Sequence, residues 1–433
     1  MPITVITGEQ RGDEGKGRFV DMLAEEHDIV ARFNGGSNAG HTIVLPDERV
    51  LKLHLVPSGI AHGHIMNVIG NGTVLNPVKL LEEINDLKDL GIDVSPARLA
   101  ISSAVHLIMP HHISEDERSE LGEGRQGTTK NGIRDAYGDK ARRKGVRAEI
   151  INNDLPTLFN TVYNNLVAEN VEREVVGLDR IDEKTTSREY VESALLLGEY
   201  VTDTVLLLNK ELRKDTPARV LAEGAQAFLL DNDQGMYPYT TSSSTTAGGV
   251  ASGLGVPPQF IDRVVGVSKA VQSHVGDGPF VTEITNPELL ADLHGDMSTV
   301  DAERGTTTGR TRRLGHLDLP GIRRSQMVNG TGEMALTKLD WVPRYGKQVL
   351  ICVAYLRKGK TLEIAPDAGY KLEKSSPIYE SLPTWEEDIQ NVRKFSKLPL
   401  EARNYIWFIE DKLNVPLTLI GVGPNREQVI KRP

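Results

Sequence analysis

Short runs of aliphatic and β-branched residues alternate along the chain with longer segments in which apolar residues recur every three or four positions. Short apolar runs are typical of buried strands, and the wider spacing is typical of amphipathic helices. The runs predict strands over Ile3–Thr7, Ile29–Phe33, Met66–Ile69, Val220–Ala222, Val264–Val267, Met334–Leu339, Val349–Tyr355 and Leu417–Ile420. The periodic segments predict helices over Gly17–Glu26, Val78–Leu90, Arg188–Arg213 and Leu400–Leu413, with the strongest pattern at Glu189–Arg213.

This alternation predicts an α/β fold, with a mostly parallel central sheet flanked by helices on both faces. No repeat, low-complexity tract or Pro/Ser-rich linker interrupts the pattern, so we expect residues 1–433 to form a single large domain. Two glycine-rich polar stretches, Gly122–Gly145 and Gly235–Gly255, predict long loops. Long loops inside a compact domain are usually functional or disordered.

The composition excludes several classes of protein. The 433 residues carry a formal charge of -10, which argues against a general nucleic-acid binder. No apolar run approaches the roughly 20 residues of a membrane-spanning helix, and the N-terminus does not resemble a signal peptide. The one cysteine, Cys352, cannot form an internal disulfide. We therefore expect a cytoplasmic protein with no membrane association and no nucleic-acid partner.

A glycine-rich turn, Thr7–Arg18, joins the first predicted strand to the first predicted helix. Such a turn points backbone N–H groups at an anion, and Lys16 adds a positive charge for terminal phosphates. A standard phosphate loop has glycine in place of Gln10 and Ser or Thr in place of Gly17. The Mg²⁺-binding hydroxyl is thus absent, and Asp13 lies within the loop. Asp13 could bind Mg²⁺ or take a proton from a nucleophile that attacks a phosphoryl group.

Three further segments carry candidate chemistry at predicted strand ends or in polar loops. His41 follows the glycine-rich loop 34–40, where an imidazole could donate to an oxygen that gains charge. The carboxylate of Asp340, at the end of Thr337–Asp340, could accept from N1–H and the 2-amino group of guanine. Gln226 could bond to a purine edge.

Arginines and hydroxyls gather in segment 305–313. Guanidinium groups match carboxylates in a two-point arrangement, so a dicarboxylic substrate such as aspartate is a natural ligand.

Together, these segments resemble the adenylosuccinate synthetase family. The resemblance runs from Gly12–Gly17 to Gly423–Pro424, and its other motifs are Asn38–Thr42, Gly127–Thr129, Glu223–Gln226, Thr245–Gly249, Thr307–Arg310 and Thr337–Asp340. It implies a P-loop-like GTP-binding ligase fold with long active-site loops. The implied reaction joins L-aspartate to IMP, with GTP as co-substrate and one Mg²⁺ per subunit, through a 6-phosphoryl-IMP intermediate. It gives adenylosuccinate, GDP and phosphate, in the AMP branch of purine biosynthesis.

The resemblance also implies residue roles. Asp13 is the base, His41 the acid, and Gln226 assists at the purine oxygen; Asp13 and the Gly40 carbonyl hold Mg²⁺. The implied GTP contacts are Gly12, Glu14, Gly15, Lys16, Gly17, Gly40, His41, Thr42, Arg312, Lys338, Leu339, Asp340, Gly421, Val422 and Gly423. The implied IMP contacts are Asp13, Lys16, Asn38, Ala39, Gly40, His41, Thr129, Arg143, Gln226, Thr241 and Arg310. Aspartate contacts fall on Thr306, Thr307, Thr308, Gly309, Arg310, Thr311 and Arg312. The family is homodimeric, with Arg143 reaching into the partner's site.

Several positions depart from the family pattern, mostly near the expected purine monophosphate: Arg11, Ser37, Lys130, Asn131 and Thr311. Gly421 replaces a serine beside the GTP. One alternative is therefore a 2-aminoadenylosuccinate synthetase that acts on dGMP, as in a related phage branch. That branch tends to lose the acid at the Asp13 position, which favours IMP here. A second alternative is a GTP-binding module without catalysis.

Overall fold

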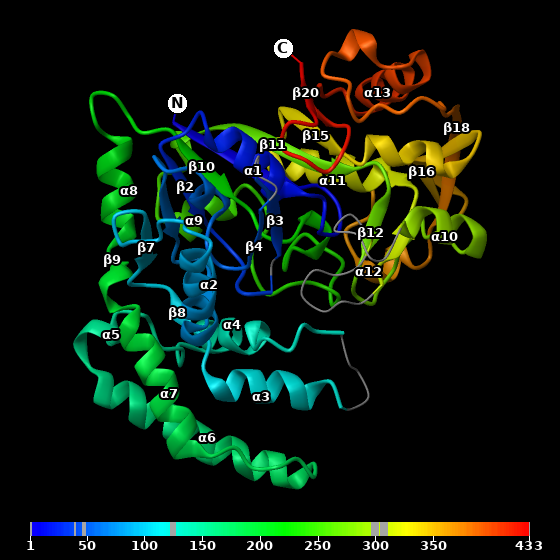
Figure 1. Ribbon diagram of the computed structural model, residues 1–433. Coiled ribbons are helices and arrows are strands. Elements are labelled where there is room, and N and C mark those ends of the chain that lie inside the picture. Colours follow the sequence, from blue (N-terminus) through cyan, green and yellow to red (C-terminus); the bar gives the residue numbers. More distant parts are fainter. Residues whose placement is uncertain are drawn as a thin grey trace.

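The computed structural model describes residues 2–38, 40–45, 49–121, 127–295, 303 and 311–432. At its centre lies a ten-stranded sheet with the order β20-β19-β15-β11-β1-β10-β2-β5-β7-β9 (Figure 1). In chain order these strands are β1 (Ile3–Gly8), β2 (Ile29–Arg32), β5 (Met66–Ile69), β7 (Leu99–Ser102), β9 (Val201–Thr202), β10 (Val220–Glu223), β11 (Ile261–Lys269), β15 (Glu333–Thr337), β19 (Leu417–Gly421) and β20 (Val429–Lys431). Every neighbouring pair is parallel except β19 with β20. The predicted mostly parallel sheet is confirmed.

Strand β1 lies between β10 and β11, and all six of its residues are buried. A strand that is covered on both faces by helices has no polar side, which explains its continuous apolar run. Successive side chains point to opposite faces: Ile6 packs with Phe19 on one face, and Val5 packs with Leu208 and Leu254 on the other. The carboxyl ends of the parallel strands meet at one edge, where open α/β sheets bind their ligands.

Helices cover both faces of the sheet and extend beyond it. They are α1 (Lys16–Ala24), α2 (Pro77–Asp89), α3 (Pro110–Ser119), α4 (Ile133–Arg142), α5 (Ile150–Asn153), α6 (Leu155–Val175), α7 (Glu183–Leu196), α8 (Thr204–Leu212), α9 (Gly249–Leu254), α10 (Pro287–His294), α11 (Leu319–Asn329), α12 (Gly369–Leu372) and α13 (Leu400–Leu413). Helices α3, α6 and α7 pack together in the lower part of Figure 1. None of the helices within the described residues is long and apolar enough to cross a membrane.

A second, smaller sheet joins β14 (Leu317–Asp318), β16 (Gln348–Arg357), β17 (Lys360–Leu362) and β18 (Ser376–Pro383). The predicted strand at Val349–Tyr355 is therefore confirmed, but it belongs to this sheet and not to the central one. Short two-stranded pairs complete the β-structure: β3 (His41–Val44) with β4 (Val50–Leu53), β6 (Val74–Leu75) with β8 (His106–Leu107), and β12 (Gln272–His274) with β13 (Arg313–Gly315).

The prediction of one helix over Glu189–Arg213 is wrong. Helix α7 ends at Leu196, a short strand at Val201–Thr202 pairs with β7, and α8 begins at Thr204. Gly198 marks the break, and the Asp203 carboxylate caps α8 by accepting the Leu206 N–H at 2.9 Å. A helix cap and a sheet partner distant in sequence outweigh the continuous apolar period.

Three other expectations need correction. The predicted loop Gly122–Gly145 contains α4, and the predicted loop Gly235–Gly255 contains α9 at its end. Helix α6 is not predicted at all. Inward-facing residues of α6 recur every four positions, at Leu158, Val162 and Leu166. The opposite side carries exposed apolar residues, including Val171. The helix therefore lacks the one-sided pattern on which the prediction relies.

Candidate active site

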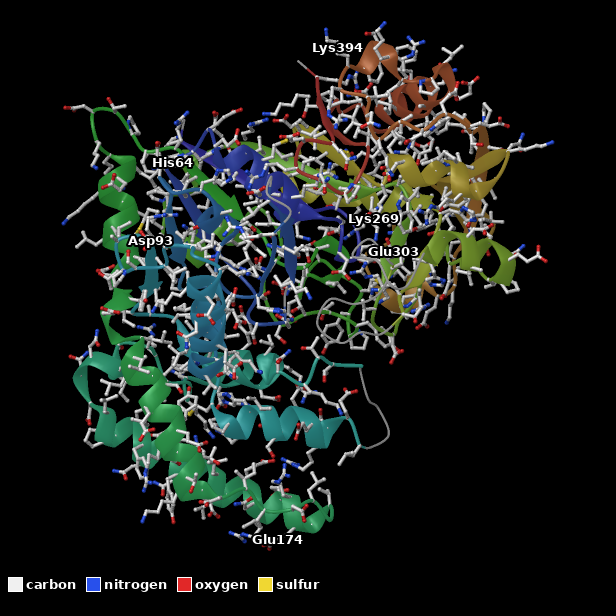
Figure 2. All side chains as sticks on the ribbon, viewed as in Figure 1. His64, Asp93, Glu174, Lys269, Glu303 and Lys394 are labelled. Atoms are coloured by element: carbon white, nitrogen blue, oxygen red, sulfur yellow. The ribbon has the colours of Figure 1, made fainter. Side chains whose placement is uncertain are left out.

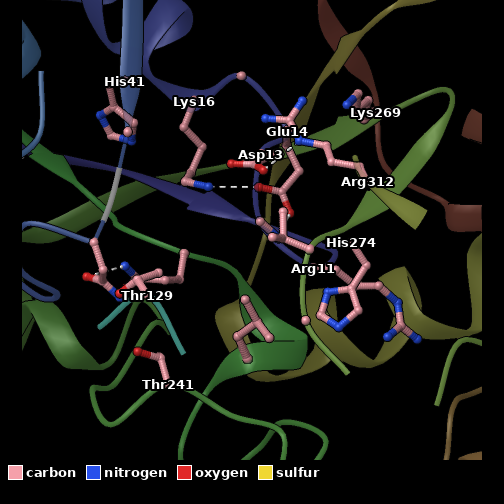
Figure 3. A pocket seen from close by; sticks show the side chains of 18 of the residues that line it. Arg11, Asp13, Glu14, Lys16, His41, Thr129, Thr241, Lys269, His274 and Arg312 are labelled. Atoms are coloured by element: carbon pink, nitrogen blue, oxygen red, sulfur yellow. Dashed lines mark hydrogen bonds and ion pairs between the residues drawn. The ribbon is translucent and has the colours of Figure 1, made fainter. Parts of the chain in front are cut away.

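The carboxyl ends of β1, β10, β11 and β15 surround a cavity of about 630 Å³, seen from close by in Figure 3. This volume falls within the range of about 300–1,000 Å³ that is typical of small-molecule sites. Most of the predicted site residues line it: Gly12, Asp13, Glu14, Gly15, Lys16, Gly17, Asn38, Gly40, His41, Thr42, Thr129, Gln226, Thr241, Arg312, Lys338, Asp340 and Gly423. Residues scattered over four hundred positions thus meet in one place.

The remaining predicted residues lie elsewhere. Leu339 and Val422 are buried in the hydrophobic core, and Gly421 ends β19. Arg143 is exposed just after α4, and Thr311 is exposed next to Arg312. Ala39 and the segment Thr306–Arg310 lie outside the described residues.

The phosphate loop is held by its own acid, Glu14. The Glu14 carboxylate accepts the backbone N–H of Gly12 at 2.8 Å and that of Gln10 at 3.3 Å, and it accepts from the Lys16 ammonium at 2.7 Å. The side chain of Glu14 is fully buried. Glu14 therefore orients the amides and the lysine that sequence analysis assigned to phosphate binding.

Asp13 projects from the same loop in a left-handed backbone conformation, with φ 58°. Short polar residues such as aspartate tolerate this conformation better than most. One carboxylate oxygen lies 2.8 Å from Nε of Arg312, and the side chain is 30% exposed. The geometry places an accessible carboxylate on the cavity wall beside a guanidinium (Figure 3).

His41 is oriented by Glu223, a residue to which sequence analysis gave no role. The imidazole Nδ1 contacts the Glu223 carboxylate, which also accepts from the Ser58 hydroxyl at 2.9 Å and the Ser58 N–H at 2.8 Å. This contact leaves Nε2 as the nitrogen available to a ligand. Burial lowers the pKa of His41, while the Glu223 carboxylate acts in the opposite direction. The signal for Glu223 is its place directly at the end of β10.

Gln226 also has a left-handed backbone, with φ 57°. Its side-chain amide donates to Asn38 Oδ1 at 3.2 Å, which links two residues that were predicted to bind the purine nucleotide. The other end of the amide, Oε1, is buried and has no hydrogen-bond partner among the described residues. An unsatisfied buried polar atom at a cavity wall is a feature that a bound ligand can complete.

Another part of the cavity wall is formed by Thr337, Lys338 and Asp340 and by the turn at Gly423. The Thr337 hydroxyl donates to the Glu14 carbonyl at 2.8 Å, so β15 is tied to the phosphate loop. Arg18 donates to the carbonyl of Gln428 at 2.6 Å and that of Asn425 at 2.8 Å, and it also contacts the Gly423 carbonyl. A Cβ on Gly421 would lie 3.0 Å from this guanidinium, so the glycine at this unusual position leaves room for Arg18.

The departure at Arg11 lies in the wall of the cavity, where its side chain is buried. Its guanidinium lies over the Phe280 ring at 4.5 Å and donates to Met236 Sδ at 2.8 Å. Burial lowers the pKa of Arg11 to about 10. These contacts pack the side chain, but its Nε and Nη2 atoms are buried and have no hydrogen-bond partner among the described residues. Such atoms on a cavity wall are available to a bound ligand.

His111 and His112 lie near Asp139, with side-chain atoms close enough for a metal ion. The Met109 N–H donates to Nδ1 of His112 at 3.0 Å, which leaves the proton of the neutral ring on Nε2, 3.3 Å from Asp139. A protonated nitrogen cannot bind a metal. The hydrogen bonds of His112 therefore favour a structural role for the pair.

Comparisons with known proteins find relatives over nearly the whole chain. The chain matches the family described as adenylosuccinate synthetase over residues 5–430. It is 45% identical to the adenylosuccinate synthetase of Salinibacter ruber, covering 99% of this chain and 98% of the relative, and 42% identical to that of Halothermothrix orenii, with the same coverage. The fully ligated Plasmodium falciparum adenylosuccinate synthetase superposes over 100% of both chains with a TM-score of 0.89 and 36% identity.

A cyanophage S-2L succinoaminodeoxyadenylate synthetase, solved with dGMP and with dATP as energy donor, has a TM-score of 0.63 and 20% identity, covering 100% of this chain and 95% of that one. At this identity the likeness concerns the fold alone.

Proposed function

The chain belongs to the adenylosuccinate synthetase family, and on this premise we propose that its cavity joins L-aspartate to IMP at the expense of GTP. The observation that carries the proposal is the convergence of Asp13, Lys16, His41, Gln226 and Asp340 on one cavity. The uninterrupted match over residues 5–430 also supports one functional domain.

In the first step, the Asp13 carboxylate takes the proton from N1 of the purine, and O6 attacks the γ-phosphorus of GTP. The O6–phosphorus bond forms while the bond from the γ-phosphorus to the bridging oxygen breaks, so GDP leaves. A neutral carbonyl oxygen is a weak nucleophile, so a proton acceptor within reach of the purine ring is needed. The second N–H of the Gln226 amide, the one not used by Asn38, donates towards O6, and Nε2 of His41 faces the transferred group.

In the second step, the amine of aspartate attacks C6 of the phosphorylated purine. The C6–O6 bond breaks and inorganic phosphate leaves, which is a far better leaving group than hydroxide. Arg312 and the neighbouring 306–311 segment are the proposed aspartate contacts, since guanidinium groups bind carboxylates in a two-point arrangement. The amine loses its proton as adenylosuccinate forms.

Mg²⁺ fits the donors that are present, because carboxylate and carbonyl oxygens are its preferred protein ligands. The Asp13 carboxylate and the Gly40 carbonyl line the same cavity and would hold the ion. When bound, Mg²⁺ neutralises charge on the phosphate oxygens.

We also propose a homodimer in which Arg143 reaches into the partner's site, since this residue is exposed and does not line the cavity of its own chain. A cytoplasmic location suits a chain with one buried cysteine.

A substrate panel tests the function. GDP and phosphate release is measured with IMP, dIMP, GMP and dGMP, each with GTP or ATP, with and without aspartate. The proposal predicts release only with IMP, GTP and aspartate together. Turnover with dGMP would instead identify the 2-aminopurine activity, and GTP binding without aspartate-dependent release would identify a non-catalytic binding module.

A further inference from the structure

Glu303 is a fully buried carboxylate on the cavity wall, and the reaction scheme above gives it no part. Figure 2 shows it beside Lys269, near the carboxyl end of β11. One oxygen, Oε2, accepts from the Lys269 ammonium at 2.6 Å and from the Arg312 guanidinium at 3.0 Å. The other, Oε1, lies 3.7 Å from Nζ of Lys338. Three cations from three separate segments therefore converge on one acid.

The three nearby cations strongly favour the ionised form of Glu303. Burial alone raises the pKa of a carboxyl group, yet the pKa of Glu303 is lowered to about 2 because Lys269, Arg312 and Lys338 outweigh the burial. Burial lowers the pKa of Lys269 to about 8, although Glu303 opposes that shift. An acid that compensates three buried or half-buried cations fixes their positions, since leaving any of them uncompensated is costly.

Each of the three cations leads to a different part of the active site. Arg312 reaches from Glu303 to Asp13, where its Nε lies 2.8 Å from the carboxylate. Lys338 lies two residues before Asp340 at the end proposed for guanine. Lys269 is fixed to the phosphate loop, because its N–H donates to Gln10 Oε1 at 2.9 Å and its carbonyl accepts from Gln10 Nε2 at 3.1 Å.

The main chain reinforces the arrangement on the Arg312 side. The N–H of Arg312 donates to the Glu303 carbonyl at 3.0 Å, and the N–H of Glu303 donates to the His294 carbonyl at 3.1 Å. Glu303 therefore holds Arg312 through both backbone and side chain. Because the Arg312 guanidinium contacts two carboxylates, its positive charge is shared between Glu303 and Asp13.

We propose that Glu303 is a positioning residue that holds Arg312 and Lys338 in register, and thereby links the guanine end of the cavity to the purine-activating carboxylate of Asp13. The inference rests on the roles proposed above for Asp13, Arg312 and Asp340. Without the Glu303 charge, Arg312 would turn fully towards Asp13, and Lys338 would lose the anion that fixes its ammonium. The affinities for GTP and aspartate would fall, while the proposed IMP contacts at Asn38 and Thr129 would keep their positions.

The test compares steady-state constants of the wild type and Glu303→Gln, with Glu333→Gln as the matched control. Glu333 begins β15, at the end opposite to Thr337, and pairs with Arg263 outside the cavity. Losing a charge-assisted contact should raise KM for GTP and for aspartate about 10-fold or more. KM for IMP should stay within about twofold, and the control should keep all three KM values. A purely structural role for Glu303 would reduce the active fraction and hence kcat, and unchanged KM values in a folded variant would overturn the proposal.

Two further variants keep the test decisive. Glu303→Asp retains the charge on a shorter arm and should recover part of the lost affinity. If Glu303→Gln fails to fold, Glu303→Gln combined with Lys269→Met removes the buried cation together with its acid, and should fold with the same KM defects. Recovery of wild-type KM values in this double variant would contradict the positioning role. A wild type that does not ligate IMP and aspartate would refute the proposed function and not this inference alone.

Discussion

Gly17 lies so close to His41 that a Cβ on the glycine would stand 2.7 Å from the His41 Cβ and 3.0 Å from its Cγ. Gly17 occupies the place at which a standard phosphate loop carries a serine or threonine. The lack of space therefore explains why no hydroxyl-bearing side chain stands here. Helix α1 and the strand that starts at His41 approach each other closely at this point. His41 takes up the room that a metal-binding side chain would need.

Gly17→Ala should lower kcat about 100-fold, because His41 must move and misplacement of a reacting group by about 1 Å has an effect of this size. The control is Gly138→Ala in α4, where the nearest atom to an added Cβ is the flexible end of Arg142 at 4.0 Å. The control should keep full activity and gain about 0.5–1 kcal/mol of stability. Equal activity of the two variants would disprove the steric account.

Asp13→Ala should reduce ligation by about 1,000-fold or more while leaving the fold intact, since a positioned base contributes about 10²–10⁴-fold. Arg312 keeps Glu303 as its partner in this variant, so the cavity wall should hold. Aspartate-dependent phosphate release measures the loss, and circular dichroism checks the fold. Substantial remaining turnover would remove Asp13 from the role of base.

Sequence patterns predicted the elements near the site better than those distant from it. All eight predicted strands are present, because short apolar runs in a sheet that is covered on both faces have little alternative. The order of the strands was beyond reach, since β1 pairs with β10 and β11, more than two hundred residues away. Helices α6 and α8 show a second limit of sequence patterns. Helix α6 exposes apolar residues and so lacks a one-sided pattern. The start of α8 is determined by the Asp203 cap, which an apolar period does not reveal.

The same holds for the active site. The glycine-rich loop identified Asp13 and Lys16, because phosphate binding needs an unusual local backbone that glycines reveal. Glu223 and Glu303 escaped notice since their function depends on partners that are distant in sequence, 182 residues away for His41 and 34 for Lys269. A carboxylate that orients another side chain leaves no local pattern.

Asp340→Asn should lower kcat/KM with GTP about 100-fold or more and raise the relative use of xanthosine triphosphate. The carboxylate accepts from N1–H and the 2-amino group of guanine, whereas xanthine offers an oxygen at position 2 that suits the amide donor. Asp277→Asn, at another part of the cavity wall, is the control for the loss of charge. If the two variants show the same nucleotide selectivity, the assignment of guanine recognition to Asp340 is wrong.

Glu223→Gln should lower kcat about 100-fold and shift the alkaline limb of its pH profile to lower pH. The negative charge of Glu223 raises the pKa of His41 against the effect of burial, so its removal makes the imidazolium form less stable. Activity that needs this form is then lost at a lower pH. Ser58→Ala removes only a neighbour of the carboxylate and should leave the position of the limb nearly unchanged. A uniform drop in rate with no shift would contradict the proposed acid role of His41.

Glu9→Gln should make the stability of the protein less dependent on pH between about 4.5 and 7. Glu9 is fully buried, and burial raises its pKa from 4.5 to about 7 against hydrogen bonds from Ser325, Thr331 and Thr7. The folded state therefore keeps a proton that the unfolded chain releases. The resulting loss of stability is absent below pH 4.5, because Glu9 is then protonated in both states. It grows as the pH rises and is complete above pH 7.

One unit of pKa corresponds to about 1.4 kcal/mol, so the difference in unfolding free energy between variant and wild type should rise by about 3 kcal/mol from pH 4.5 to pH 8. Any fixed effect of the new amide cancels in this comparison, including that of the Oε2 position, which has no hydrogen-bond partner among the described residues. Urea denaturation at the two pH values measures the change, with the exposed Glu192→Gln as control. The control should show no such difference, and an equally small change for Glu9→Gln would mean that the buried carboxyl does not control the stability in this range.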